Sequence, residues 1–310
     1  MTRGGAGGTG TTGGISGSPD LMSSGRASME LMGVSLAPFV LALAGFIPVS
    51  TGPAGGVVWQ GRIPNSIVAW DTRPSAVYLP PGFTVNQRYP VVYLLHGMSG
   101  SPSSFWDGLQ LANVADTLIT AGARPFIAVM PVAGPVVHRG QGEWAGVWES
   151  YVVKDVVPWV DAHLPTLPRA SDRALEGLSA GGFGAMDIGL RHPGLFGTLG
   201  SWGGYFAPVF RDGPFVHMAK RQLKAHDPTV LVHREAVALR RAGVRFYISS
   251  DGGHGVVLGR WSTAFSAELS KLGLPYKLWL TNDSHGFWRS TLPSALAYAA
   301  AGFKTRAPIG

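Results

Sequence analysis

Residues 173–192 read RALEGLSAGGFGAMDIGLRH, and the architecture can be worked out from them. The first part, Arg173–Leu178, is short and largely apolar and predicts a strand, whereas the small residues from Gly181 onward predict the start of a helix. Between them stands the pattern G-x-S-x-G, centred on Ser179. A serine on such a tight strand-to-helix turn has its hydroxyl lifted off the sheet, and the flanking glycines leave room for neighbouring backbone. We therefore predict that Ser179 is a nucleophile.

Strand-like and helix-like segments alternate on both sides of this turn. Short apolar runs predict strands at 77–79, 91–95, 126–130, 174–178, 245–249 and 276–280. Helix-length segments lie between them at 103–121, 151–163, 181–192, 227–241 and 260–272. Strands that alternate with helices predict a mostly parallel sheet with helices on both faces. We therefore expect one α/β domain over residues 57–310.

Two further segments precede this domain. Residues 1–28 are rich in Gly, Ser and Thr, cannot build a core and are predicted to be disordered. Residues 29–50 contain the apolar run Leu31–Val49, which carries no charge and follows Arg26 and Glu30. This pattern predicts a signal sequence or a single membrane anchor, and with it an exported protein. A helix packed against the domain is the alternative.

The composition excludes several classes of protein. The 310 residues include no Cys, which excludes a cysteine nucleophile, a disulfide framework and thiolate metal sites. The net charge of +7 comes with no nucleic-acid-binding motif, so we expect no nucleic-acid partner. No metal-ligand spacing such as H-E-x-x-H occurs. Since acyl transfer through a serine needs no cofactor, we predict neither a cofactor nor a metal ion.

Two further side chains would complete a catalytic triad. In folds with this serine turn, an acid and then a histidine follow the nucleophile along the chain. His285 lies in a loop just after the predicted strand 276–280 and is the predicted general base, with His254 as the alternative. Asp251 directly follows the preceding predicted strand and is the predicted acid. Asp283 is a weaker candidate, because residues so near to His285 seldom face it correctly.

The predicted oxyanion donors are backbone groups. The apolar strand 91–95 ends in His96-Gly97-Met98, and a loop at this position can offer an N–H to a developing oxyanion. We predict the Met98 N–H as one donor, with Gly97 as its competitor, and the N–H of Ala180 as the second. His96 precedes the nucleophile along the chain, so we expect it to be structural, hydrogen-bonded beneath the loop.

These features together resemble a known family, the putative-esterase group of α/β-hydrolases, which includes esterase D (S-formylglutathione hydrolase), feruloyl esterases and mycolyltransferases. The stretches that carry the resemblance are VYLPPG at 77–82, RYPVVYLLHG at 88–97, WESYVVKDVVPW at 148–159, GLSAGG at 177–182, HGFW at 285–288 and LPSAL at 292–296. By position, the family's nucleophile falls on Ser179, its histidine on His285 and its oxyanion donors on Met98 and Ala180. The acid differs, because the chain has SSDG at 249–252 where the family often has a Gly-Thr-x-Asp-like loop.

The resemblance implies an α/β-hydrolase fold and a carboxylic ester hydrolase that works through an acyl-enzyme. The substrate would be a small-molecule, lipid or carbohydrate ester. One alternative is an acyltransferase of the mycolyltransferase type, which passes the acyl group to a sugar hydroxyl. A non-catalytic binding module of the cell envelope on the same fold is another, and the intact Ser179 and His285 count against it. A peptidase of the prolyl-oligopeptidase type is disfavoured because the chain has no propeller-sized N-terminal domain.

Overall fold

The computed structural model of the 310-residue chain describes residues 43–68, 72–133, 144–208, 215, 218–252, 257–282 and 287–303. Among these residues, no helix combines the length and the apolar character that a membrane crossing requires. The segment predicted at 1–28 and most of the one predicted at 29–50, up to residue 42, lie outside the described residues, so export stays a prediction.

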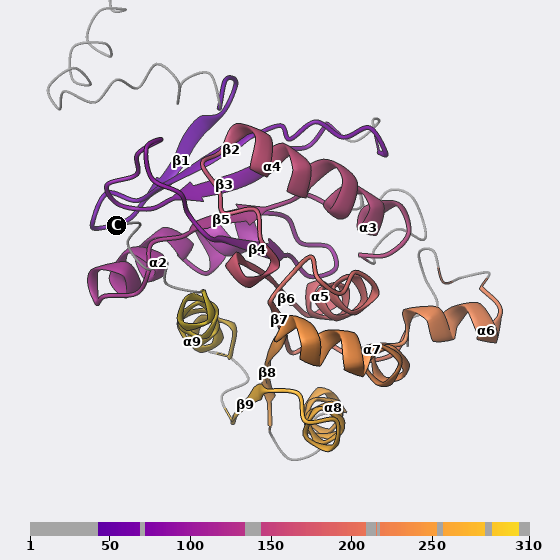
Figure 1. Ribbon diagram of the computed structural model, residues 1–310. Helices are drawn as coiled ribbons and strands as arrows, with labels where there is room; N and C mark the ends of the chain where they lie inside the picture. Colours follow the sequence, from indigo (N-terminus) through magenta and orange to yellow (C-terminus); the bar gives the residue numbers. More distant parts are fainter. Residues whose placement is uncertain are drawn as a thin grey trace, which may run out of the picture.

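The described strands form a nine-stranded sheet in the order β1-β2-β3-β5-β4-β6-β7-β8-β9 (Figure 1). The pairs β1–β2, β2–β3 and β3–β5 are antiparallel. The remaining pairs, from β5–β4 to β8–β9, are parallel. The strands are β1 (Ile47–Thr51), β2 (Val57–Gly61), β3 (Ser75–Leu79), β4 (Val91–Leu95), β5 (Ile127–Met130), β6 (Arg173–Leu178), β7 (Thr198–Trp202), β8 (Arg245–Asp251) and β9 (Tyr276–Thr281). The carboxyl ends of β4, β6, β7, β8 and β9 therefore share one edge of the sheet.

Helices cover both faces of the sheet, which explains why central strands such as β4 are apolar along their whole length. The helices are α2 (Leu111–Thr120), α3 (Val147–Tyr151), α4 (Val157–His163), α5 (Ala180–Arg191), α6 (Lys220–Leu223), α7 (Pro228–Ala242), α8 (Val257–Lys271) and α9 (Phe287–Gly302). Side chains from α3, α4, α5, α7 and α8 share one core cluster, whereas those of α2 and α9 share another on the opposite face (Figure 1). The expected α/β architecture, a mostly parallel sheet between two helical layers, is confirmed.

The domain begins earlier than the predicted start at residue 57. Residues 47–50, the end of the segment predicted as a signal or anchor, form most of edge strand β1. The buried carboxylate of Asp116 on α2 holds the turn after β1, because it accepts hydrogen bonds from the N–H groups of Ala54 (2.8 Å) and Gly56 (3.1 Å). Tyr78 donates a third from its hydroxyl (2.7 Å). This hairpin is part of the folded domain, which corrects both boundaries.

Strand β2, strand β7 and helix α9 were also not predicted. Strand β7 reads TLGSW, and its Gly and Ser hide a strand that is nevertheless buried throughout. Helix α9 contains Pro293, a residue that normally marks the end of a helix. The strands predicted from apolar runs are all present. Most of these runs fill positions that are buried on both faces of the sheet, as in β3, β4 and β5, whereas β9 lies at the edge and is only partly buried.

Candidate active site

Ser179 stands on a strained turn between β6 and α5. Its backbone angles are φ 54° and ψ −117°, a conformation that costs a non-glycine residue about 1–3 kcal/mol. The turn is held on both sides: the Ser179 N–H donates to the carbonyl of Trp202 on β7 (2.8 Å), and the Gly182 N–H donates to the Ser179 carbonyl (2.8 Å). The surrounding hydrogen bonds therefore impose the strand–turn–helix geometry expected of a nucleophile.

The two glycines that flank Ser179 are sterically required. A Cβ on Gly177 would lie 2.6 Å from the carbonyl oxygen of Leu95 on β4, and one on Gly181 would overlap that same oxygen. This oxygen belongs to the backbone of the central sheet, which cannot move aside cheaply. The glycines of the G-x-S-x-G pattern thus follow from the tight packing of β4, β6 and α5.

The loop after β4 lies beside Ser179, as the predicted oxyanion site requires. A Cβ built on Gly97 would lie 3.4 Å from the Cβ of Ser179 and 2.8 Å from the side chain of Leu178. Met98 follows directly and is partly exposed. Ala180 opens α5, and the first N–H groups of a helix have no carbonyl partner within it. The structure thus places both predicted donor segments next to Ser179.

His96 fixes the loop that carries Gly97. Its Nδ1 lies 2.8 Å from the Gly97 carbonyl, and its Nε2 accepts the Ala133 N–H (3.2 Å), which requires the neutral Nδ1–H tautomer. The indole N–H of Trp144 donates to the His96 carbonyl (2.8 Å). Burial and the positive charge of Arg73 lower the pKa of His96 to about 4, although the hydrogen bond to Gly97 opposes them. The histidine is a neutral clamp beneath the loop, as expected.

The predicted acid lies at the same edge of the sheet. Asp251 is the last residue of β8, two strands from β6, and is paired in register with Thr281 at the end of β9. The predicted base His285, its alternative His254 and the alternative acid Asp283 lie outside the described residues. The first residues of α9, which follow that segment, approach the chain beside Ser179: a Cβ on Gly203, next to Trp202, would lie 2.9 Å from the indole of Trp288.

Comparison with known proteins places this arrangement in a family. The sequence profile of the family described as "Putative esterase" matches residues 70–261, more than half of the chain. The chain belongs to this esterase family. An esterase of Mycobacterium tuberculosis is 32% identical over 171 residues, which cover 52% of this chain and 35% of that protein. An endo-1,4-beta-xylanase/feruloyl esterase of Xylanibacter ruminicola is 32% identical over 147 residues, 44% of this chain and 20% of that protein. The chain thus spans about a third or less of the length of these curated relatives.

Solved structures of esterases share the fold. A ferulic acid esterase superposes with a TM-score of 0.70 at 22% identity, covering 80% of this chain and 99% of its own. An S-formylglutathione hydrolase from Agrobacterium tumefaciens gives a TM-score of 0.67 at 18% identity, covering 84% and 100%. At such identities the similarity concerns architecture, and it establishes the α/β-hydrolase fold.

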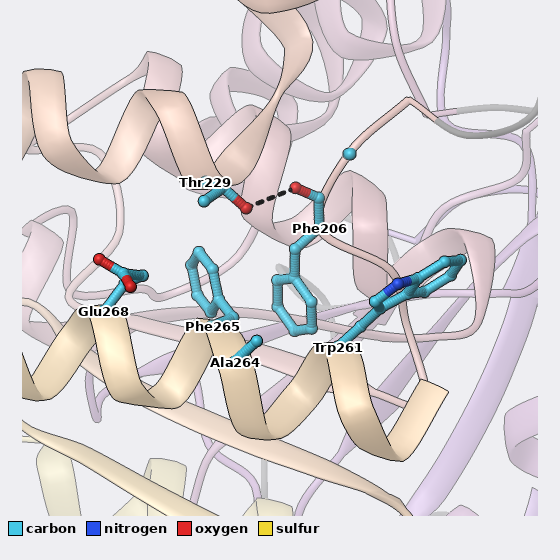
Figure 2. Close-up of a pocket in the computed structure, with 7 residues that line it drawn as sticks. Phe206, Thr229, Trp261, Ala264, Phe265 and Glu268 are labelled. Carbon is cyan, nitrogen blue, oxygen red and sulfur yellow. Dashed lines mark hydrogen bonds between the residues drawn. The ribbon is translucent and has the colours of Figure 1, made fainter. Parts of the chain in front are cut away.

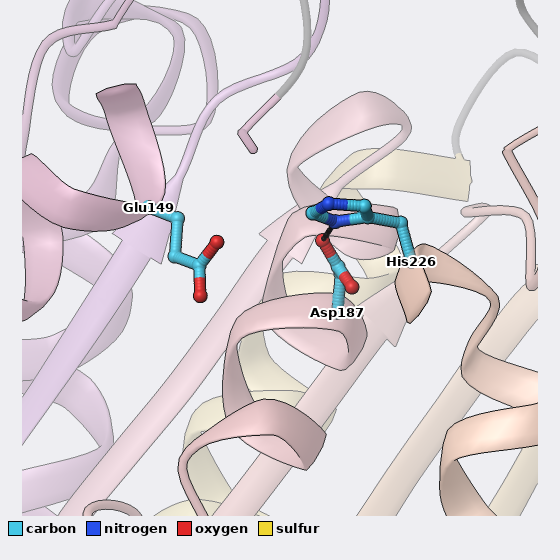
Figure 3. A group of neighbouring side chains, drawn as sticks. All are labelled: Glu149, Asp187 and His226. Atoms are coloured by element: carbon cyan, nitrogen blue, oxygen red, sulfur yellow. Dashed lines mark hydrogen bonds and ion pairs between the residues drawn. The ribbon is translucent and has the colours of Figure 1, made fainter. Parts of the chain in front are cut away.

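A charged cluster at the far end of α5 was not foreseen in the sequence. Figure 3 shows Glu149 from α3, Asp187 from α5 and His226 from the turn after α6 facing one another, with all three side chains buried. His226 Nδ1 lies 2.8 Å from Asp187, and His192 Nε2 lies 2.8 Å from Glu149. Carboxylates and an imidazole can ligate a divalent metal ion. Here, however, the guanidinium of Arg191 already lies among them, 3.0 Å from Glu149 and 3.1 Å from both ring nitrogens of His226.

This cluster ties α3 and the turn after α6 to the helix that carries Ser179. Its members come from three elements far apart in the sequence, so no local spacing signals it. Burial alone would raise the pKa of Glu149, but the hydrogen bond from His192 and the charge of Arg191 outweigh it and lower that pKa. We interpret the cluster as a structural network that contains its own cation.

Proposed function

We propose that the protein is a serine-dependent carboxylic ester hydrolase that works through an acyl-enzyme. The observation that carries this proposal is the strained backbone of Ser179, held between glycines that admit no side chain and beside the Gly97 loop. Strain of this kind persists only where the surroundings impose it, and it clusters at reactive residues. Membership of the esterase family supports the same chemistry.

The proposed reaction has two acyl-transfer steps. Ser179 Oγ attacks the ester carbonyl carbon while His285 accepts the hydroxyl proton, and Asp251 orients the imidazole and stabilises its positive charge. The N–H groups of Met98 and Ala180 bind the oxyanion of the tetrahedral intermediate. Its collapse breaks the C–O bond to the alcohol, which leaves with the proton from His285. Water then attacks the acyl-enzyme with the same assistance, releases the acid and restores the serine hydroxyl.

The first test replaces the nucleophile. Ser179→Ala removes the attacking oxygen, so p-nitrophenyl acetate turnover should fall by roughly 10⁴-fold or more, while the unfolding midpoint stays close to that of the wild type. A fluorophosphonate probe should label the wild type at Ser179, as located by peptide mapping. Ser270→Ala, an exposed serine on α8, is the control and should keep full activity. Turnover that survives in Ser179→Ala would exclude the proposal.

The identity of the acid is tested by a pair of variants. Asp251→Asn should lower kcat strongly, because an amide cannot stabilise the imidazolium and favours the wrong tautomer of the histidine. Asp283→Asn should have a small effect. The reverse result would assign the acid to Asp283 and remove Asp251 from the triad.

A further inference from the structure

A pocket of about 200 Å³ opens between α7, α8 and the loop after β7 (Figure 2). Phe206 and Phe265 stack face to face on one side of it, with ring centroids 4.2 Å apart. Trp261 and Ala264 on α8 continue the wall along the helix, as Figure 2 shows. The pocket is therefore lined mainly by aromatic and aliphatic carbon.

The hydroxyl and the carboxylate at its rim are already engaged within the protein. The Thr229 hydroxyl donates to the Phe206 carbonyl (3.0 Å). The Glu268 carboxylate pairs with Lys271 (2.7 Å) and lies 2.9 Å from His233 Nε2. A ligand would find no free charge here among the described residues, so the pocket favours a group that needs none.

The wall formed by Phe206 is connected to the nucleophile by a short, closely packed piece of chain. The Ser179 N–H donates a hydrogen bond to the carbonyl of Trp202, and Phe206 follows Trp202 by four residues. Within this piece, a Cβ on Gly204 would lie 2.9 Å from the first turn of α5, and Tyr205 stacks on Phe183 of the same helix (4.9 Å). Four residues span at most about 14 Å, so the pocket lies within the reach of one extended substrate.

The part of the wall that α8 contributes is anchored at the predicted acid. A Cβ on Gly259, in the first turn of α8, would lie 2.8 Å from the carbonyl oxygen of Asp251. Trp261 follows two residues later, and it packs against the cluster that contains Ala180, the residue after the nucleophile. The Phe206 segment and α8 therefore extend from the ends of β7 and β8, the strands that carry or adjoin the proposed catalytic groups.

We infer that this pocket binds an apolar hydrocarbon group of the ester substrate, at a distance from the scissile bond. The inference rests on the proposed function and extends it to substrate choice. An apolar cavity of about 150 Å³ holds one benzene molecule, so a pocket of about 200 Å³ has room for one aromatic ring or a short alkyl chain. The acyl part and the alcohol part of the ester are the two possible sources of this group.

The test fills the pocket from α8 and uses a neighbour on the same helix as the control. Ala264 is exposed and lines the pocket, whereas Ala267 is also exposed and does not line it. In Ala264→Trp the indole should occupy the space, and in Ala267→Trp it should project into solvent. Equal unfolding midpoints for the two variants would show that the fold tolerates both.

Activity is then measured on p-nitrophenyl esters from acetate to decanoate. Each methylene that enters an apolar pocket contributes about 0.8 kcal/mol, or roughly fourfold in kcat/KM. The wild type and Ala267→Trp should therefore gain activity with chain length, and Ala264→Trp should lose about 10- to 100-fold on the longest esters and less than about twofold on acetate. A parallel series of acetate esters with lengthening alcohols shows which side of the ester occupies the pocket.

Two results would overturn the inference. In the first, kcat/KM depends on chain length in the same way in the wild type and in Ala264→Trp, for the acyl series and for the alcohol series. The other is an equal loss on every ester including acetate, because a filled binding pocket cannot affect a substrate that never reaches it.

A binding measurement separates this inference from the proposed function. Calorimetry with 4-phenylbutanamide, an apolar probe without an ester bond, is carried out on Ser179→Ala and on Ser179→Ala/Ala264→Trp. Affinity at least tenfold weaker in the double variant supports the pocket even if wild-type turnover proves not to depend on Ser179. Equal affinity in the two proteins rejects the pocket even if the esterase proposal holds.

Discussion

Two buried glutamates, one near each end of α5, differ in the direction in which their pKa is shifted. Glu176 lies on β6 just before the serine turn, and burial there raises its pKa to about 8, although a hydrogen bond from the Trp202 indole (3.0 Å) opposes the shift. Glu149 lies on α3, beside the last residues of α5, and burial also acts to raise its pKa. There the His192 hydrogen bond and the Arg191 charge prevail, and the pKa is lowered. The same side chain is kept neutral in one place and ionised in the other.

The difference teaches where the protein tolerates charge. Beneath the serine turn, Glu176 and His96 both have pKa values that favour the neutral form at pH 7. A fixed charge there would shift the proton affinity of the proposed catalytic groups through a medium of low dielectric constant. At the far end of α5, charge serves instead to join α3 and the turn after α6 to the helix. The proposed catalytic groups and the charged cluster thus lie at opposite ends of one helix.

The largest effect should come from removing the internal cation of the charged cluster. Arg191→Met keeps much of the side-chain volume but leaves Glu149 and Asp187 without their guanidinium. Breaking a buried ion pair from one side costs about 3–5 kcal/mol, and because the Arg191 side chain is 28% exposed we expect about 2–3 kcal/mol. Urea unfolding at pH 7 measures this loss.

An exposed ion pair provides the control for this variant. Arg234 contacts Glu235 at 2.7 Å, but its side chain is 53% exposed, so Arg234→Met should cost less than about 0.5 kcal/mol. Equal losses for Arg191→Met and Arg234→Met would mean that the cluster contributes nothing beyond a surface ion pair. The contrast between the two ends of α5 would then lose its basis.

The next effect concerns the uncharged end and appears in catalysis rather than in stability. In His96→Asn the shorter side chain cannot bond to both Gly97 and Ala133, so the loop with the proposed Met98 donor should be held less precisely. Loss of one well-placed oxyanion donor costs about 10²–10³-fold in kcat, and a loosened donor should cost about 10- to 100-fold. KM should change less than about twofold. His163→Asn, at an exposed histidine on α4, should alter neither constant.

A different outcome would change the role given to His96. If KM rises while kcat is unchanged, the loop contributes to substrate binding and not to the oxyanion site. If only the unfolding midpoint falls, His96 supports the fold alone.

Much of the fold and part of the candidate site could be predicted from the sequence, because both depend on local patterns. Runs such as VVYLL at 91–95 are apolar on every residue, which a strand buried on both faces requires. The glycines around Ser179 are equally local, since each is required by backbone packed directly against it.

The rest could not be predicted because it depends on contacts between distant segments. Strand β7 is defined by its neighbours β6 and β8 rather than by its own TLGSW sequence. The sequence of strand β1 resembles part of an export signal. Its place in the domain depends on Asp116, more than sixty residues later, which binds the turn that follows the strand. The Glu149–Asp187–His226 cluster likewise exists only once three separate elements have packed together.

The last effect has the opposite sign and should come from Glu176→Gln. The glutamine oxygen can still accept the Trp202 indole hydrogen, and no charge has to be buried. Because the folded-state pKa of Glu176 is raised to about 8, the folded protein binds more protons than the unfolded chain between about pH 4.5 and pH 8. The carboxyl ionises in the unfolded chain before it does so in the folded protein, so the free energy of unfolding falls as pH rises through this window. The variant should be more stable than the wild type by about 1–3 kcal/mol at pH 7.

Urea unfolding at pH 5, 7 and 9 tests this expectation. The advantage of Glu176→Gln should be small at pH 5, grow as the pH rises to about 8, and then level off. Glu149→Gln provides the mirror image: its wild-type carboxyl has a lowered pKa, so the variant should be destabilised at pH 7, and the deficit should shrink as pH falls through that pKa. If the two variants instead shift stability in the same direction at every pH, the charge state of these buried carboxyls is not what distinguishes the two ends of the helix.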